Sequence, residues 1–535
     1  MSSTQDNVSY EYSMSSDSAE VAGKPYLKKE LLYVIDNNGS QDYSRNQVEF
    51  ETVSLSNNGK WAEYKNGFIS IPCVGVVERS AGQGISAEKA KDLIRMKASN
   101  ASLIDSMITS YGNVNVVQEN PNICPYLIFK QHTTMSLNDV EINKHTGYRK
   151  DDSDSWGYAD DVGIYNNKVE NNESLQEEVF VQHDAQKAKV LSNDIVKASG
   201  ENTYSNLGVG AAANELVHVF DYDCIIRLKD LPFFEKMILT RGGNIKITLK
   251  LNQFESTITN THTAVNGATP KFDTRTVTNS LRGSSVPLIR CETYNDAAKE
   301  LLSGKADESY TEKISLKVVQ NGAYTHEKKQ CRLYVPTYTM SPTFEKSYLS
   351  QGEKTIVYED VFMKHIKIKG VGGFQELLTN SLSRMQKLII VPMLSASANG
   401  ALGVGPAESL FATEPSTCSP YSIKDFNVQL SGSNLYQQSI EYKYEHYLNE
   451  MNGNMGVNAN LETGLCSSMI SSKDYNSNYG YIVCDLSRRY DYDDKTPLSL
   501  QIKGTIASGK ELDLLCYVVY KKDMTIDLST GARKD

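Results

Sequence analysis

The chain has 535 residues, of which 40% are hydrophobic and 22% are charged, a composition typical of folded globular proteins and unlike that of disordered or fibrous ones. Its formal net charge is −10 and its basic residues are scattered, which argues against the basic surface that non-specific nucleic-acid binding needs. Because all-β domains often reach about 200 to 250 residues each, the length suits two large β domains.

The N-terminal 44 residues are predicted to form a flexible acidic arm, since the first 23 contain no Lys or Arg and are rich in serine. Met1 to Asn7 lacks the pattern of a secretory signal, and no apolar run approaches the 18 residues of a membrane span. The nine cysteines include no CxxC pair, which favours reduced thiols. We therefore expect synthesis and folding in the cytosol.

Alternation of apolar and polar residues with a period of two predicts many strands, most clearly at 244–252, where Ile245, Ile247, Leu249 and Leu251 alternate with polar residues. In chain order the predicted strands are 47–55, 68–77, 216–228, 244–252, 315–320, 331–339, 356–369, 388–394, 426–430, 481–486, 498–503 and 512–520. This pattern favours antiparallel sheet.

Predicted helices are few and short. The segment 86–98 begins with a capping serine, and 374–385 has apolar residues three and four apart. The aromatic-rich segments 124–133 and 441–450 are also predicted to be helical. Strands do not alternate with long helices, so the pattern favours an antiparallel sandwich over a parallel doubly wound fold.

A weak internal repeat is visible as a recurring order of features. A strand precedes a second strand ending in proline, then come a hairpin turn, a helical piece, a strand ending in Asp-Leu and an alternating strand. In the first copy these features lie, in this order, at 47–55, 68–72, 112–113, 124–133, 230–231 and 244–252. In the second copy the same features lie, in the same order, at 356–369, 388–392, 432–433, 441–450, 485–486 and 498–503. The repeat predicts two tandem eight-stranded sandwiches, at 45–350 and 351–535, the second including the C-terminal tail.

Several short motifs resemble chemical sites, but each lacks an essential part. Residues 504–511 follow the phosphate-loop pattern up to Lys510, but Glu511 replaces the required Ser or Thr and a strand follows where a helix is needed. The other weak matches are a loose dinucleotide motif at 208–213, an incomplete calcium loop at 151–163 and the acidic cluster Asp491, Asp493 and Asp494, which could bind a cation between subunits. We predict no catalytic residue, no cofactor and no metal, although paired carboxylates leave no spacing signature and stay open.

Five segments resemble the double jelly-roll major capsid proteins of polinton-like viruses and virophages, the adenovirus-type capsid lineage. The clearest reads Leu-Pro-Phe-Phe-Glu-Lys-Met at 231–237, followed by Arg241-Gly-Gly and the alternating strand. The others are 48–72, 332–338, 426–432 and 481–489. The resemblance implies two tandem antiparallel jelly rolls with short helices and long loops, in a homotrimer that forms a pseudohexagonal capsomer of the icosahedral shell of a double-stranded DNA virus.

The resemblance further implies that neighbouring capsomers, a penton protein and possible minor or cement proteins are partners, in a virion made in the host cytosol, without sequence-specific DNA binding by this chain. Long polar loops at 144–213, 255–284, 396–420 and 452–478 would supply outer surface or subunit contacts, unless they are insertions without a role. The candidate assembly residues are Trp61, Pro232, Phe233, Phe234, Arg332, Tyr334, Phe426, Arg488 and Arg489.

Two other interpretations stay open. Phe233, Phe234 and Trp61 could close the core of a sandwich instead of contacting a neighbouring subunit, because aromatic residues dominate both kinds of surface. The alternative functions are a carbohydrate-binding or carbohydrate-cleaving β-sandwich protein, which two tryptophans disfavour, and a minor coat or fibre protein of the same virus.

Overall fold

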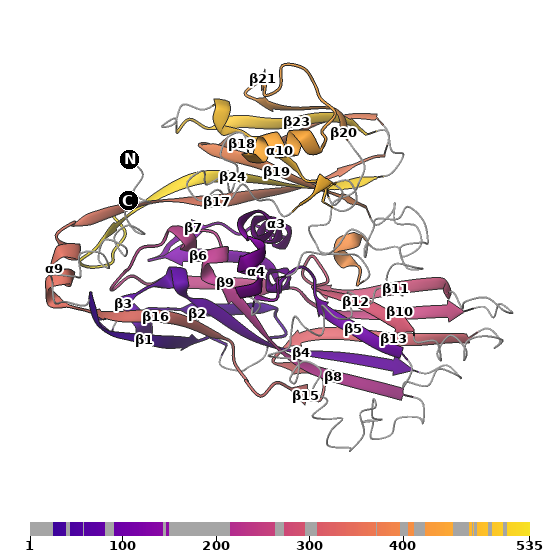
Figure 1. Ribbon diagram of the computed structural model, residues 1–535, viewed down its shortest axis with the longest axis horizontal. Helices are drawn as coiled ribbons and strands as arrows, with labels where there is room; N and C mark the ends of the chain where they lie inside the picture. The colour runs from indigo at the N-terminus through magenta and orange to yellow at the C-terminus, as the bar shows by residue number, and fades with distance from the viewer. Residues whose placement is uncertain are drawn as a thin grey trace.

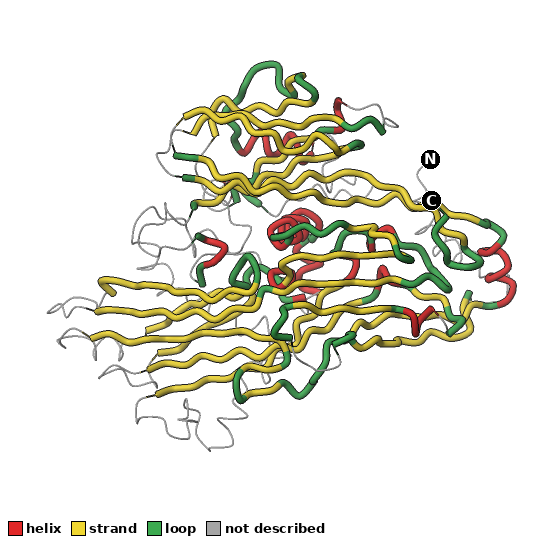
Figure 2. The backbone as a smooth tube through the Cα atoms, turned by 180° about the vertical axis from the view of Figure 1, so that it is seen from behind, coloured by secondary structure: helices red, strands yellow, loops and turns green. Residues whose placement is uncertain are grey.

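A computed structural model describes residues 25–38, 43–56, 58–80, 90–142, 146–148, 215–262, 272–294, 308–370, 372–395, 405–410, 423–452, 470–472, 475, 479–489, 495–506 and 511–534. The described chain is dominated by antiparallel strands (Figures 1 and 2). Among the described residues, no helix is long and apolar enough to cross a membrane.

The first unit is a sandwich of two antiparallel four-stranded layers. One layer has the order β1-β16-β4-β8 and the other β2-β9-β6-β7. The bounds are β1 (Tyr26–Ile35), β2 (Gln47–Glu51), β4 (Phe68–Ser80), β6 (Ile104–Tyr111), β7 (Val114–Val117), β8 (Glu215–Arg227), β9 (Ile245–Leu251) and β16 (Arg332–Met340). If these eight strands are numbered along the chain, the neighbours in the first layer are the first, eighth, third and sixth strands. The neighbours in the second layer are the second, seventh, fourth and fifth strands.

The second unit repeats this order. Its layers are β17-β24-β19-β22 and β18-β23-β20-β21, which again join strands first-eighth-third-sixth and second-seventh-fourth-fifth. The bounds are β17 (Glu353–Ile368), β18 (Gly372–Leu382), β19 (Met385–Leu394), β20 (Ile423–Leu430), β21 (Ser433–Asn434), β22 (Ile482–Asp485), β23 (Leu498–Ile506) and β24 (Leu512–Asp527). Two packed sheets wound in this way form a jelly roll, so the chain is a double jelly roll.

Additional strands extend the first unit well beyond its sandwich, at the right of Figure 1. The far half of β4 pairs with β13, which continues into β10 and β11, and β5 pairs with β12. The remaining strands are β3 (Trp61–Ala62), β5 (Ala90–Met96), β10 (Gln253–His262), β11 (Phe272–Arg282), β12 (Leu288–Tyr294), β13 (Glu308–Val318), β14 (Gln320–Asn321) and β15 (Tyr324–Thr325). In chain order, β3 lies between the second and third strands of the jelly roll, β5 between the third and fourth, and β10 to β15 between the seventh and eighth.

Short helices connect or cover the sheets. They are α2 (Val53–Ser56), α3 (Cys124–Thr134), α4 (Leu137–Ile142), α9 (Pro342–Leu349) and α10 (Tyr444–Asn452), with 3₁₀ turns at Tyr64–Asn66, Asn100–Leu103, Leu228–Asp230, Phe234–Lys236, Pro406–Glu408 and Ser487–Arg489. Helix α9 joins the two units, and α3 lies between them (Figure 1). One continuous hydrophobic core includes residues from both units.

The alternating strand β9 shows how the sequence specifies the sandwich. Ile245, Ile247, Leu249 and Leu251 are fully buried, while Lys246 and Lys250 are exposed. One face of β9 therefore packs in the core and the other contacts water, as the period of two predicts.

The structure confirms most of the predicted repeat. The two strands ending in proline are the third strands, the two hairpin turns join the fourth and fifth strands, and the Asp-Leu pairs follow the sixth strands. One pairing is wrong, because 47–55 contains the second strand of its unit whereas 356–369 lies in a first strand. The true first strand of the first unit is β1, which lies within the predicted arm and pairs along its length with β16.

Two predicted helices are strands. The segment 374–385 lies mostly in β18, and 90–96 of the predicted helix 86–98 form β5. In β18 the pairing with β23 shifts register twice, so its apolar residues do not keep a strict period of two. Irregular spacing of this kind is easily mistaken for a helical pattern.

Candidate assembly surfaces

Trp61 lies in the core at the connection between the units. Its side chain is buried, its ring meets Tyr348 of α9 edge-on at 5.1 Å between centroids, and the guanidinium carbon of Arg241 lies 4.9 Å from the ring centroid. Tyr348 in turn donates a hydrogen bond to the backbone oxygen of Leu239 at 3.0 Å. Trp61 thus packs the first unit against the connecting helix.

The segment Pro232-Phe233-Phe234 also lies inside the molecule. All three residues are buried, and Phe233 adopts a backbone φ of 75°, which is uncommon for a residue with a bulky side chain. This conformation directs its ring against Phe234 and against Tyr358 of β17, at centroid distances of 5.4 and 5.0 Å. Within one chain, these aromatic residues join the first unit to the second.

Polar contacts strengthen the same junction. The buried Asp360 carboxylate of β17 accepts hydrogen bonds from Tyr520 at 2.9 Å and Lys522 at 2.7 Å. Lys522 also donates to the backbone oxygen of Val116 in the first unit, as does the Tyr358 hydroxyl at 3.0 Å. The junction is therefore both apolar and hydrogen-bonded, which favours a fixed arrangement of the two units.

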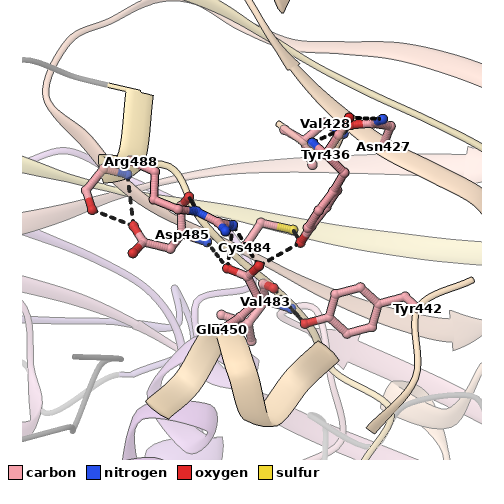
Figure 3. A network of polar contacts seen from close by, with 10 residues as sticks. Asn427, Val428, Tyr436, Tyr442, Glu450, Val483, Cys484, Asp485 and Arg488 are labelled. Carbon is pink, nitrogen blue, oxygen red and sulfur yellow. Dashed lines mark hydrogen bonds and ion pairs between the residues drawn. The ribbon is translucent and has the colours of Figure 1, made fainter. Parts of the chain in front are cut away.

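Phe426 and Arg488 belong to the second unit, on β20 and in the turn after β22. Phe426 is fully buried and meets Tyr442 edge-on at 5.9 Å. Arg488 donates two hydrogen bonds to the carboxylate of Glu450, at 2.7 and 2.8 Å, from the turn that follows β22 (Figure 3). The neighbouring Arg489 lies in the same turn, and its side chain is outside the described residues.

Glu450 is the centre of this network. Besides Arg488, its carboxylate accepts hydrogen bonds from the backbone nitrogen of Asp485 at 2.8 Å and the hydroxyl of Tyr436 at 3.0 Å (Figure 3). Burial, followed by the nearby Cys484 and Glu450, raises the pKa of Tyr436, so the phenol remains a proton donor. The network fixes α10 against β22 and the turn after it.

Arg332 and Tyr334 lie on a different kind of surface, the outer face of the layer β1-β16-β4-β8. The Tyr334 ring stacks on Phe68 at 4.8 Å and lies 5.8 Å from Tyr33, while the Arg332 guanidinium lies 5.1 Å from the Tyr33 ring centroid. Leu31 and Tyr33 are 53% and 52% exposed. We call Leu31, Tyr33, Phe68, Arg332 and Tyr334 the outer aromatic face.

Tyrosine and arginine are enriched at protein interfaces, and exposed apolar patches of this kind mark contact sites. Of the nine predicted residues, the outer aromatic face includes only Arg332 and Tyr334. The prediction missed Leu31 and Tyr33 because they lie in the segment assigned to the arm. The unbroken apolar run Leu-Leu-Tyr-Val-Ile at 31–35 was the signal that could have found them.

Most of the short motifs that resemble chemical sites lie outside the described residues. Residues 504–506 of the phosphate-loop pattern lie in strand β23, and the next described residue is Glu511, just before β24. Residues 507–510 are outside the described residues, as are 151–163, 208–213 and the cluster Asp491, Asp493 and Asp494. No group of three or more His, Cys, Asp or Glu side chains in the described ranges could hold a metal ion.

A cavity of about 530 Å³ lies between the units and bears on the carbohydrate alternative. Three of its lining residues are the acids Glu408, Glu511 and Asp513, but none is Phe, Tyr or Trp. Burial, followed by the charge of Asp513, raises the pKa of Glu408. A sugar-binding groove normally offers aromatic platforms for the sugar rings, and this cavity has none among its lining residues.

Comparison with solved structures finds similar chains in viruses and a virophage. The mavirus major capsid protein is 11% identical with a TM-score of 0.46, covering 94% of this chain and 89% of that one. A chain of the Sputnik virophage is 11% identical with a TM-score of 0.45, covering 96% and 89%. The Faustovirus major capsid protein is 9% identical with a TM-score of 0.42, covering 94% and 91%.

No protein-family model and no curated protein sequence matches the chain. The fold assignment therefore rests on the strand order within the chain, which is the same in both units.

Proposed function

We propose that this chain is the major capsid protein of a double-stranded DNA virus. In this role it would self-assemble as trimers that tile the facets of an icosahedral shell. The observation that carries the proposal is that both units of the chain have the same jelly-roll strand order. Three copies of such a chain would supply six similar units to one ring. Identical chains that meet through two different surfaces form closed rings when the rotation closes.

The outer aromatic face supports the proposal from a second direction. A sheet face carrying exposed Leu31 and Tyr33 beside Arg332 has the composition of a contact surface rather than of an ordinary solvated sheet. The interior of the chain is hydrogen-bonded and apolar at the junction of the units, so each chain can act as one rigid building block. A structural role without catalysis fits this architecture.

Further partners follow from the proposed role. A shell of pseudohexagonal capsomers needs a separate penton protein at its fivefold vertices, and minor or cement proteins can join neighbouring capsomers. The protein would be made in the host cytosol and reside in the virion. The net charge of −10 leaves genome packaging to other components.

Sedimentation velocity of the purified chain, together with quantitative mass spectrometry of virus particles, tests the function. We expect trimers in solution and this chain as the most abundant protein of the particle. A monomer at every salt concentration, absent from particles, would rule out the proposal. Release of reducing sugar from glycans by the purified chain would instead support the carbohydrate-cleaving alternative.

A further inference from the structure

The repeat allows a row of residues across the same four strands to be compared in the two units. In the second unit, Met363, Tyr517, Ile389 and Val483 pair directly across the first, eighth, third and sixth strands. In the first unit, the row Tyr33, Tyr334, Phe68 and Arg227 pairs across the strands of the same order. Both rows have a tyrosine on the eighth strand.

These two rows have different surroundings. Tyr517 is fully buried, because α3 of the first unit lies against it: the Tyr126 and Tyr517 rings are 5.9 Å apart. The Tyr517 hydroxyl donates to the backbone oxygen of Asn122 at 2.7 Å, just before α3. By contrast, Tyr33 in the first-unit row is 52% exposed. With respect to the described residues, the face that the chain covers in its second unit is open in its first.

The helix equivalent to α3 in the second unit is α10. Each follows the fifth strand of its unit, and each holds the segment after the sixth strand: Gln131 of α3 bonds Asp230, and Glu450 of α10 bonds Asp485. Aligning Gln131 with Glu450 places Glu445 at the position of Tyr126.

The same alignment places Leu448 at the position of Phe129, whose ring meets Tyr481 of the second unit edge-on at 4.9 Å. Glu445 is exposed and Leu448 is half-buried in this chain. The side of α10 that corresponds to the covering side of α3 is therefore available for a contact.

Charge is complementary between the two open surfaces. Arg332 on the outer aromatic face stacks on Tyr33, and its Nε atom is buried without a hydrogen-bond partner among the described residues. The residue that α10 would bring over this face is an acid, Glu445. The Arg332 side chain is half-buried, so a carboxylate from another chain would pair with the exposed part of its guanidinium group through a charge-assisted hydrogen bond.

We propose that α10 of a second copy of this chain covers the outer aromatic face, with Glu445 of that copy paired with Arg332. The contact repeats between chains the arrangement that α3 makes within one chain. It rests on the proposed function and specifies the surface through which the trimer closes. Because the two surfaces differ, the contact is heterologous and forms a ring.

Charge reversal on each surface, followed by the combined exchange, tests this pairing. Arg332→Glu and Glu445→Arg should each weaken trimer association about 100-fold, as loss of a desolvated charge pair does at interfaces. The double variant Arg332→Glu with Glu445→Arg should recover to within about tenfold of wild type, because the opposite charges face each other again. Sedimentation velocity over a dilution series measures all of these constants.

Two controls keep the outcome clear. Lys424→Glu makes the same charge reversal at an exposed residue of β20, outside both surfaces, and should leave association unchanged. Glu445 is exposed, so its variant tests the contact even if Arg332→Glu fails to fold. If neither single substitution weakens trimer association, the proposed contact is wrong while the proposed function stands. The same follows if the double variant associates no more tightly than the weaker of the two single variants. A wild-type chain that stays monomeric would overturn the proposed function itself.

Discussion

Asp360 provides the sharpest test of how the two units are held together. Its carboxylate is fully buried and accepts hydrogen bonds from Tyr520 and Lys522 and, through its other oxygen, from the backbone nitrogen of Val361 at 2.9 Å. Asp360→Ala removes these acceptors and leaves the Lys522 ammonium without its carboxylate. Breaking a buried pair on one side costs about 3 to 5 kcal/mol. Because the Lys522 side chain is 24% exposed and can gain water, we expect the lower end, about 3 kcal/mol.

A double-mutant cycle measures this interaction. Urea unfolding of Asp360→Ala, Lys522→Met and the double variant gives the three changes in unfolding free energy. We expect the double variant to be less destabilised than the sum of the single variants by about 1 to 3 kcal/mol, the range found for residues in one network. A loss below about 1 kcal/mol for Asp360→Ala, or full additivity, would refute the reasoning.

Three further predictions concern the core, a buried lysine and the Glu450 network. Leu249→Asp should abolish soluble expression because it places an unpaired carboxylate in the core, whereas Lys250→Asp on the exposed face should express; soluble Leu249→Asp trimers would show that the face is wrongly assigned. Burial lowers the pKa of Lys97 to about 7 from its usual 10.5. At pH values between 7 and 10.5, Lys97 is therefore protonated in the unfolded chain and neutral in the folded chain. Wild type should therefore gain unfolding free energy relative to Lys97→Met as pH rises from 7 to 10, and denaturant titrations showing a constant difference would contradict this. Glu450→Gln, which keeps the shape but loses the charge facing Arg488, should lower the melting temperature, and an unchanged melting curve would assign the network no stabilising role.

The sequence predicts this fold well wherever strands have one buried face. β9 and the alternating part of β23 were identified because their apolar residues keep a period of two. The dipeptides Gly112-Asn113 and Gly432-Ser433 predict the hairpin turns, and both glycines have positive φ, a conformation that glycine adopts without strain. Local chemistry decides these features, so local patterns reveal them.

The misassigned elements are those whose environment is set by distant parts of the chain. β1 was placed in the arm because acidic and serine-rich residues precede it, and only its pairing with β16, about 300 residues later, makes it a strand. The candidate residues were likewise recognised as aromatic and basic, but their position could not be read locally. Burial of Phe233 depends on Tyr358 of the other unit, and Tyr334 stays half-buried because no described element covers its face as α3 covers the second unit.

Electron microscopy of the purified protein tests the central claim most directly. We predict particles with six lobes and threefold symmetry, in which the two jelly rolls of each chain alternate around the ring and α10 of one chain lies on β1 of the next. Single two-lobed particles at all protein and salt concentrations, or rings that leave the outer aromatic face on their periphery, would contradict the account.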